Sequence, residues 1–276
     1  MNIFTIDLEE WFHINDSTWI PVEQWPDLEQ RVIANANIIL SFLKRHNIKA
    51  SFFVLGWIAE QYPELIRQIA GDGHDIGYHS YYHRIPKFQT QKAFEKDLRN
   101  GIELLEKITA QKIKYYRAPN FSLENKWMLD SLADHGIQVS SSIKNPISHN
   151  KKDLPFMPFE FRRGSHRIIE LPLNTKNLIF IKLVFSGSGY FRILPYQLLK
   201  QLFNREAYLM LYFHPNDFDT NLPTPPELGV VRNTLNTICT STTLSKLELL
   251  ANHFSFISIS QALNTIIPDS LPVIYY

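Results

Sequence analysis

The chain has 276 residues, 28 basic and 27 acidic side chains, and a hydrophobic fraction of 45%. The charges nearly cancel and no block of five or six like charges occurs, which excludes the electrostatic footprint of a protein that binds nucleic acid or an anionic membrane. A chain of this length can bury one substantial core, so we expect a single domain over residues 1–276.

The cysteine content and the first residues bear on where the chain acts. Cys239 is the only cysteine, so no intramolecular disulfide can form and the fold needs no oxidising compartment. The start, MNIFTIDLEEWF, has no Lys or Arg and three carboxylates by position 10, unlike a secretory signal. No apolar run reaches the roughly 18 to 20 residues of a membrane span. We therefore expect a cytoplasmic protein, which could act at the inner face of the membrane.

The first half of the chain alternates short apolar segments with longer amphipathic ones. This pattern predicts strands and helices in alternation as far as residue 143. The strands are expected at 2–6, 49–55, 74–79, 113–118 and 137–143, and the helices at 27–46, 62–73, 91–109 and 124–136. Such alternation is typical of parallel strands joined by crossover helices, in an open doubly wound sheet or a barrel.

The second half is less regular. Two strand candidates, 165–173 and 177–185, precede the segment SGSGYFR, whose glycines suggest a sharp turn against something that the backbone must approach closely. The remaining pattern predicts a helix at 195–204, a strand at 207–214, a proline-rich loop at 221–229, and two helical segments around the apolar 254–259. We interpret 1–219 as the core and 220–276 as an extension that closes the same domain.

Polar side chains gather at the expected carboxyl ends of the strands. Alternating β/α folds place their functional groups at these ends. The candidates are Asp7, Glu9, Glu10, His79, His83, Arg117, Ser140 to Ser142, and His214.

His79 and His83 are four residues apart in DIGYHSYYHR. On a helical turn this spacing places two side chains on one face, with Cβ atoms about 5 to 6 Å apart, which suits two imidazoles that bind one metal ion. The chain has ten histidines, so two solvated loop histidines at this spacing are an open alternative. A carboxylate from Glu9 or Glu10 would complete a site of two histidines and one carboxylate.

Three further residues could each have either a catalytic role or an ordinary structural or surface role. Asp7 lies two residues before Glu9, so both side chains share one face of a strand, where one could bind an ion and the other accept a proton; a solvated strand end is the alternative. Arg117 ends an apolar strand and could keep an aspartate ionised, or lie on the surface. His214 also ends a strand, and it could be a general acid or a satisfied rim histidine.

Four ordered motifs, TIDLEEWF, GYHSYYH, YYRAPNF and LYFHP, resemble the polysaccharide deacetylases of carbohydrate esterase family 4, the NodB-homology domain. The segments FFVLGWIAEQYPELIRQIAGDGHDIGYHSYYH, SGSGYFRILPY and FHPNDFD resemble the branch found in bacterial exopolysaccharide and exosortase gene clusters. The resemblance covers nearly the whole chain. It implies an α/β fold of the distorted, incomplete (β/α) barrel type and hydrolytic removal of N-acetyl groups from an amino-sugar polysaccharide or its precursor.

The resemblance also implies a role for each catalytic candidate. Asp7 is similar to the catalytic base, Arg117 to the arginine that orients the base, and His214 to the general acid that protonates the leaving amine. We expect Asp7 to take a proton from a metal-activated water as that water attacks the acetamide carbonyl.

A divalent metal ion, which we expect to be Zn²⁺, is implied with His79 and His83 as ligands. The third ligand of the family usually follows the base directly, but Leu8 occupies that position here. Some divergent members use the acid two residues after the base, and we therefore prefer Glu9, which shares the face of Asp7, to Glu10.

Substrate contacts are implied for Tyr116, Pro119 and Tyr190, and an oxyanion donor for a backbone N–H near Tyr116 or Arg117. The related branch often has an aspartate where this chain has Ser140, which puts in doubt the groups that support the site from behind.

Two other functions are weighed against the deacetylase. One is a metal-independent ureide or amide hydrolase of the same superfamily, against which the intact histidine pair argues. The other is a catalytically weakened carbohydrate-binding protein, suggested by Glu9 and Ser140. In each of the carbohydrate readings the partner is an N-acetylated sugar chain or a lipid-linked precursor, and the sequence does not determine the oligomeric state.

Overall fold

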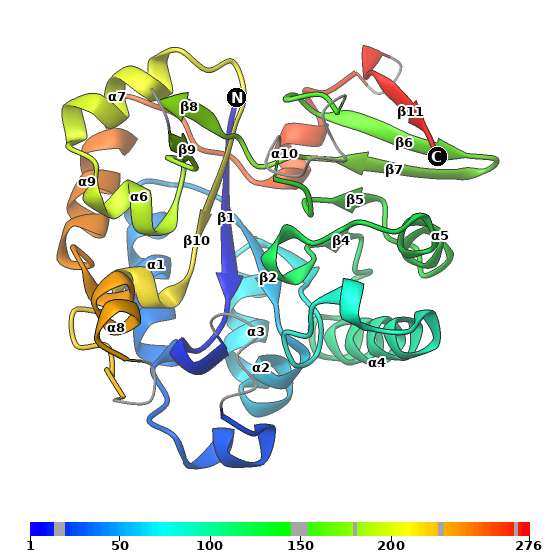
Figure 1. The fold of residues 1–276 in the computed structure, drawn as a ribbon, viewed down its shortest axis with the longest axis horizontal. Coiled ribbons are helices and arrows are strands. Elements are labelled where there is room, and N and C mark those ends of the chain that lie inside the picture. Colours follow the sequence, from blue (N-terminus) through cyan, green and yellow to red (C-terminus); the bar gives the residue numbers. More distant parts are fainter. Residues whose placement is uncertain (14–19, 145–153, 179–180, 226–228, 268–269) are drawn as a thin grey trace.

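A computed structural model describes residues 1–13, 20–144, 154–178, 181–225, 229–267 and 270–276. A nine-stranded sheet runs through the molecule in the order β10-β1-β2-β3-β4-β5-β7-β6-β11. In Figure 1, helices α7 and α9 lie to the left of strand β1, helix α4 lies to the right of strand β2, and helix α5 lies to the right of strand β4. None of the helices in the described ranges is long and apolar enough to cross a membrane.

The strands of this sheet are mostly parallel. From β10 to β7 every neighbouring pair is parallel, β6 runs antiparallel to β7, and β11 is parallel to β6. The strands are β1 (Asn2–Leu8), β2 (Ser51–Val54), β3 (Asp75–Tyr78), β4 (Tyr115–Tyr116), β5 (Val139–Ser140), β6 (Phe159–Arg163), β7 (His166–Glu170), β10 (Leu209–Phe213) and β11 (Val273–Tyr275). A separate antiparallel pair is formed by β8 (Lys176–Leu178) and β9 (Ile181–Leu183).

The helices connect these strands and cover the sheet. The α-helices are α1 (Val32–Arg45), α2 (Gly56–Gln61), α3 (Pro63–Gly71), α4 (Gln91–Thr109), α5 (Lys126–Asp134), α6 (Ser188–Ile193), α7 (Tyr196–Asn204), α8 (Gly229–Thr237), α9 (Ser241–Ala251) and α10 (Ile259–Leu263). Short 3₁₀ helices are η1 (Trp11–His13), η2 (Val22–Asp27), η3 (Pro86–Phe88), η4 (Pro119–Phe121) and η5 (Pro215–Phe218).

Helix α4 shows why the sequence forms a helix at this place. Its N-cap is Thr90, whose hydroxyl accepts a hydrogen bond from the Ala93 N–H at 3.3 Å. Phe94, Leu98 and Leu105 recur at helical spacing and are buried against the sheet, while the opposite face is charged. The helix ends where Ala110 takes a left-handed conformation, with φ of 55°.

Strand β1 lies at the centre of the fold. It pairs with β2 on one side and, on the other, with β10, which comes some 200 residues later in the chain. Residues 3–8 are all buried, and the Thr5 hydroxyl donates to the Leu211 carbonyl at 2.6 Å. Because these neighbours are parallel, their carboxyl ends meet at one edge of the sheet, and Asp7, His79 and His214 are brought to that edge.

The predicted α/β class with a mainly parallel sheet is confirmed. Strands and helices occur within each expected range of the first half, although β4 and β5 have only two residues each. The single strand expected at 177–185 is wrong. This stretch contains the antiparallel strands β8 and β9, and residues 179 and 180 lie outside the described part.

Elements absent from the sequence-based expectation include α2, α6, β6 and β11, and the one helical segment expected before residue 254 is two helices, α8 and α9. Helices α2 and α6 have only six residues each, too few for a helical period to show. In β6 the buried Phe159 and Phe161 alternate with Glu160 and Arg162, but this alternation covers only four residues, the shortest run that indicates a strand. Part of the expected proline-rich loop at 221–229 lies outside the described residues.

Candidate active site

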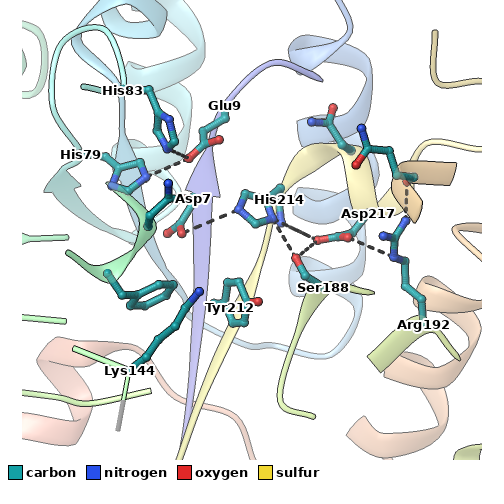
Figure 2. A pocket seen from close by; sticks show the side chains of 14 residues that line it. Asp7, Glu9, His79, His83, Lys144, Ser188, Arg192, Tyr212, His214 and Asp217 are labelled. Atoms are coloured by element: carbon teal, nitrogen blue, oxygen red, sulfur yellow. Dashed lines mark hydrogen bonds and ion pairs between the residues drawn. The ribbon is translucent and has the colours of Figure 1, made fainter. Parts of the chain in front are cut away.

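A cavity of about 250 Å³ lies at the carboxyl ends of strands β1, β3 and β10. Asp7, Glu9, His79, His83 and His214 all line it, and Figure 2 shows them facing one another around it. The structure thus brings together five of the six predicted catalytic and metal-binding residues on one cavity wall, and the sixth, Arg117, lies directly behind Asp7.

The two histidines converge on one carboxylate oxygen. Nε2 of His79 lies 2.8 Å from Glu9 Oε1, and Nε2 of His83 lies 3.2 Å from the same atom. All three side chains are buried. The loop reaches this arrangement because Ser80 and His83 adopt positive φ values of 70° and 54°, which turn both rings toward strand β1.

The hydrogen bond at Nδ1 of His79 indicates which species can lie between Nε2 of His79 and the Glu9 carboxylate. Its Nδ1 lies 2.7 Å from the carbonyl oxygen of Arg117, and because a carbonyl can only accept, Nδ1 carries the hydrogen. In the neutral ring, the lone pair of Nε2 then points at the Glu9 carboxylate, which is favourable only with a positive charge between them. A proton or a metal ion can supply that charge. Metal-bound histidines are typically held in this way by a carbonyl at the other ring nitrogen.

The donor set of Glu9, His79 and His83 therefore fits a divalent cation. Imidazole nitrogen and carboxylate oxygen are ligands that zinc accepts, and three protein ligands leave an open position. Burial opposes ionisation of Glu9, but the charge of His83 and the hydrogen bonds from both histidines hold the pKa of Glu9 well below its usual range. The carboxylate is therefore ionised and able to bind a cation.

Glu10 points away from this group. Its Oε1 accepts hydrogen bonds at 2.7 Å from the backbone N–H groups of Arg31 and Val32, at the start of helix α1. Burial raises the pKa of Glu10 to about 7, against the effect of these hydrogen bonds. The structure thus places Glu9, the carboxylate preferred from the sequence, beside the histidines and gives Glu10 to the helix terminus.

Asp7 is held by Arg117, which is completely buried. Arg117 Nη1 donates to Asp7 Oδ1 at 2.6 Å and to the Thr5 hydroxyl at 2.8 Å. The rest of the guanidinium donates to the Ser141 carbonyl and hydroxyl, and the ring of Phe53 packs 4.1 Å away. Because every side of Arg117 is fixed, Asp7 is oriented with its second oxygen toward the cavity.

The serines at 140 to 142 support Arg117 from behind. Ser140 donates to the Ser142 hydroxyl at 2.8 Å, and that hydroxyl accepts from the Ala118 N–H at 2.9 Å. Together with the contacts of Ser141, these bonds fix the segment around Arg117. The serine hydroxyls thus hold the segment around Arg117, although Ser140 stands where the related branch often has an aspartate.

His214 closes the cavity on the side of strand β10. Its Nε2 lies 3.9 Å from Asp7 Oδ2, and its Nδ1 donates to the Ser188 hydroxyl at 2.8 Å, which in turn donates to Asp217 at 2.8 Å. Burial favours the neutral ring. The hydrogen bond to Asp217 and the negative charges of Glu9, Asp217 and Asp7 outweigh it and raise the pKa of His214 to about 9.

Sequence reasoning missed the partners of His214. Asp217 follows His214 by three residues in a capping box at the start of η5, and this spacing was the available signal. Ser188 comes from SGSGYFR, and a Cβ at Gly187 would stand 1.7 Å from the Tyr212 carbonyl oxygen. The expected close backbone approach is therefore confirmed for Gly187, which lies against strand β10, whereas a Cβ at Gly189 would meet only the Arg192 side chain at 3.8 Å.

The three predicted substrate contacts stay predictions. Of the described residues, those that line the cavity include Asn120, next to Pro119, but not Tyr116, Pro119 or Tyr190. Tyr116 is buried in the core, and Tyr190 is 43% exposed. Of the positions expected to give the oxyanion donor, Arg117 uses its N–H for the Tyr78 carbonyl at 3.0 Å within the sheet ladder, and a donor near Tyr116 stays a prediction.

Comparison with known proteins identifies two regions of the chain. Residues 29–140 match the family model for polysaccharide deacetylase, and residues 141–264 match a domain of unknown function, DUF3473. A peptidoglycan-N-acetylglucosamine deacetylase of Bacillus cereus is 32% identical over 130 residues, which cover 41% of this chain and 46% of the relative. The chain spans less than half the length of the curated relatives it matches first.

Two solved structures share the fold. A Mycobacterium smegmatis protein described as a polysaccharide deacetylase aligns over 98% of this chain and 91% of its own, with a TM-score of 0.65 and 20% identity. A family 4 acetyl xylan esterase of Clostridium thermocellum, in complex with a cobalt ion, aligns over 99% of this chain and 97% of its own, with a TM-score of 0.52 and 12% identity. The predicted distorted (β/α) barrel class is thereby confirmed. Residues 29–140 are thus similar to the polysaccharide deacetylases, and residues 141–264 are similar to the DUF3473 domain.

Proposed function

We propose that the protein is a metal-dependent hydrolase that removes N-acetyl groups from an amino-sugar polysaccharide or its precursor. The observation that carries this proposal is the meeting of the Glu9, His79 and His83 group with Asp7 and His214 on one cavity. Hydrolysis of an acetamide needs a base for the attacking water and an acid for the leaving amine, and Asp7 and His214 suit these two tasks.

Glu9, His79 and His83 would hold the metal ion, which we expect to be Zn²⁺. When bound, a divalent ion lowers the pKa of water and polarises the acetamide carbonyl. The buried donors and the carbonyl that fixes His79 support a preformed site for this ion.

The chain's own residues would then handle the protons. Asp7, oriented by Arg117, accepts a proton from water as the water oxygen bonds to the carbonyl carbon. His214 donates the proton on Nε2 to the sugar nitrogen as the carbon–nitrogen bond breaks, which releases acetate and a free amine. Asp217 and Ser188 hold Nδ1, so that Nε2 faces the cavity and Asp7.

The family match of residues 29–140 supports a carbohydrate substrate. Curated relatives are named for peptidoglycan N-acetylglucosamine or N-acetylmuramic acid, so a glycan that carries N-acetyl groups is the first substrate to test. From the sequence resemblance we further propose that the natural substrate belongs to bacterial exopolysaccharide synthesis in the cytoplasm or at the inner membrane face.

The proposed metal site can be tested by measuring Zn²⁺ binding in variants of two neighbouring carboxylates, Glu9 and Glu10. We expect about one divalent ion per chain by elemental analysis and acetate release from N-acetylglucosamine oligomers that chelators abolish. Glu9→Gln should lower the affinity for Zn²⁺ by more than the about 10- to 100-fold that loss of a ligand-orienting group costs. Glu10→Gln, the matched control, should keep full affinity because Glu10 caps helix α1.

The variant Asp7→Asn distinguishes a catalytic base from a metal ligand. The variant should bind Zn²⁺ as the unchanged protein does and lose acetate release by about 100-fold or more, the size expected of a missing general base. Acetate release that survives both chelation and Glu9→Gln would show a metal-independent hydrolase instead. Glycan binding by a metal-loaded protein that releases no acetate would show a binding protein.

A further inference from the structure

Lys144 lies on the wall of the active-site cavity, directly after the serine-rich strand end. Its backbone forms an isolated parallel bridge with Leu173, and its ammonium stands 5.0 Å from the centre of the Phe121 ring. Figure 2 shows the side chain of Lys144 extending upward toward the space between Asp7 and Tyr212. A cation is therefore presented to whatever occupies the cavity.

The arginines near the cavity have other partners. Arg192 donates to the carbonyls of Leu235 and Asn236, and its Nε lies 3.4 Å from Asp217. Arg117 is bound to Asp7 and to the strand behind it. Within the described ranges, by contrast, no carboxylate lies within ion-pair distance of the Lys144 ammonium.

The contacts of Lys144 within the fold do not account for a positive charge at this place. Asp7 already accepts a 2.6 Å hydrogen bond from Arg117, which holds it in place without Lys144. Burial lowers the pKa of Lys144, and the charge of Asp7 only partly opposes this effect. A partly buried ammonium without a carboxylate partner costs free energy, and a bound anion would offset that cost.

We propose that Lys144 recognises an anionic substituent, a carboxylate or a phosphate, carried by the sugar chain close to the acetamide that is hydrolysed. The inference rests on the proposed function for the nature of the cavity, and it narrows the substrate to an acidic amino-sugar glycan. A lysine ammonium is a compact charge on a flexible stem that pairs with carboxylate and phosphate oxygens alike.

The test compares glycans that differ in charge. The probes are an N-acetylglucosamine tetramer, a tetramer in which N-acetylmuramic acid alternates with it, and a tetramer with 6-phosphate groups. Lys144→Met should lower kcat/KM for the carboxylate or the phosphate probe by about 10-fold or more, through KM, as expected for a lost hydrogen bond to a charged group. The loss of kcat/KM on the anionic probe should exceed any change on the neutral tetramer by about 10-fold, and Lys144→Arg should restore most of the preference.

Lys87→Met is the matched control. Lys87 also stands 5.0 Å from a phenylalanine ring, that of Phe88, but this pair is on the surface, where Phe88 is 78% exposed. The control removes the same charge and ring contact and should leave all three substrates unchanged. An equal loss of kcat on neutral and anionic probes in Lys144→Met would overturn the proposal, because Lys144 would then act on the reaction itself.

Calorimetric binding to Zn²⁺-loaded Asp7→Asn separates this inference from the proposed function. If an anionic probe binds more tightly than the neutral one and Lys144→Met removes the difference, the inference holds even where no acetate is released. If acetate is released but neither anionic probe is preferred, the deacetylase proposal stands and the role of Lys144 is wrong. The carboxylate and phosphate arms show which anion is recognised.

Discussion

At the residue scale, burial and side-chain direction give different roles to acidic groups that are neighbours in the chain. Glu9 and Glu10 are neighbours in the chain, yet Glu9 faces two histidines and is ionised, whereas Glu10 faces a helix terminus and has a pKa near 7. Arg117 would be costly to bury alone, but Asp7 and Ser141 satisfy its donors. The same residue types would be unremarkable on a solvated surface.

The pH dependence of turnover should depend on Asp217. His214 acts as an acid only while protonated, and its pKa is raised from 6.5 to about 9, so the protonated form is retained below that pH and lost as the pH rises through it. Asp217→Asn removes the carboxylate that raises this pKa, and burial then favours the neutral ring. We expect the alkaline limb of kcat/KM to move to lower pH by about 1 unit or more in acetate-release assays.

Asp130→Asn is a suitable control for this profile, since Asp130 accepts from Arg163 and Tyr276 away from the cavity. Its alkaline limb should coincide with that of the unchanged protein. An alkaline limb that stays in place in Asp217→Asn would show that His214 is not the acid whose titration limits the rate.

At the element scale, the segment between β3 and α4 carries His79 and His83, the two proposed metal ligands, and Asp97 of α4 holds this segment in place. One oxygen of Asp97 accepts from the Tyr78 hydroxyl at 2.7 Å, and the other accepts from the Tyr81 N–H at 3.0 Å and the Ser80 hydroxyl at 3.4 Å. Gly101 makes room for this contact, because a Cβ there would stand 2.0 Å from the Tyr78 ring. Helix α4 thus holds the loop in its left-handed turns.

Asp97→Ala should weaken metal binding without removing a ligand. Loss of the clamp releases the positive-φ turns at Ser80 and His83, and we expect the Zn²⁺ affinity to fall by about 10- to 100-fold in chelator competition. Hydrogen exchange should rise in residues 79–84 first. Glu103→Ala, an exposed position on the same helix, is the control and should change neither measurement. Unchanged affinity in Asp97→Ala would mean that the loop holds its shape alone.

At the scale of the whole molecule, the two matched regions share one sheet. Strand β1 comes before both regions, and it is flanked by β2 from the deacetylase region and β10 from the DUF3473 region. His214 and its partners Asp217 and Ser188 likewise come from the second region. The deacetylase region therefore lacks a complete candidate site by itself.

A fragment of residues 1–140 should fail to fold as a stable unit. It would lose β10, which pairs with β1 at five positions, and would expose one edge and a buried apolar face of β1 to other chains. We expect no cooperative thermal transition by circular dichroism and aggregation on concentration, in contrast to the full chain under the same conditions. A cooperative transition in the fragment would show that β10 is dispensable.

The order of elements and the candidate residues could be predicted from the sequence because they depend on local pattern. Alternating apolar segments indicate parallel strands, and parallel strands place their ends together, so Asp7, His79 and His214 could be expected at one edge. Short helices such as α2 and α6, with six residues each, carry too little period to be found in this way.

The sequence by itself determined the α/β class, the strand ends that carry polar groups, and the histidine pair with a nearby acid, because each is written in neighbouring residues. Only the tertiary structure decided which acid meets the histidines, that Asp217 and Ser188 hold His214, and that Lys144 enters the cavity. Those facts depend on the direction of side chains and on pairing between segments distant in the chain. Such pairing is set by the packing of the whole core, and no local pattern records it.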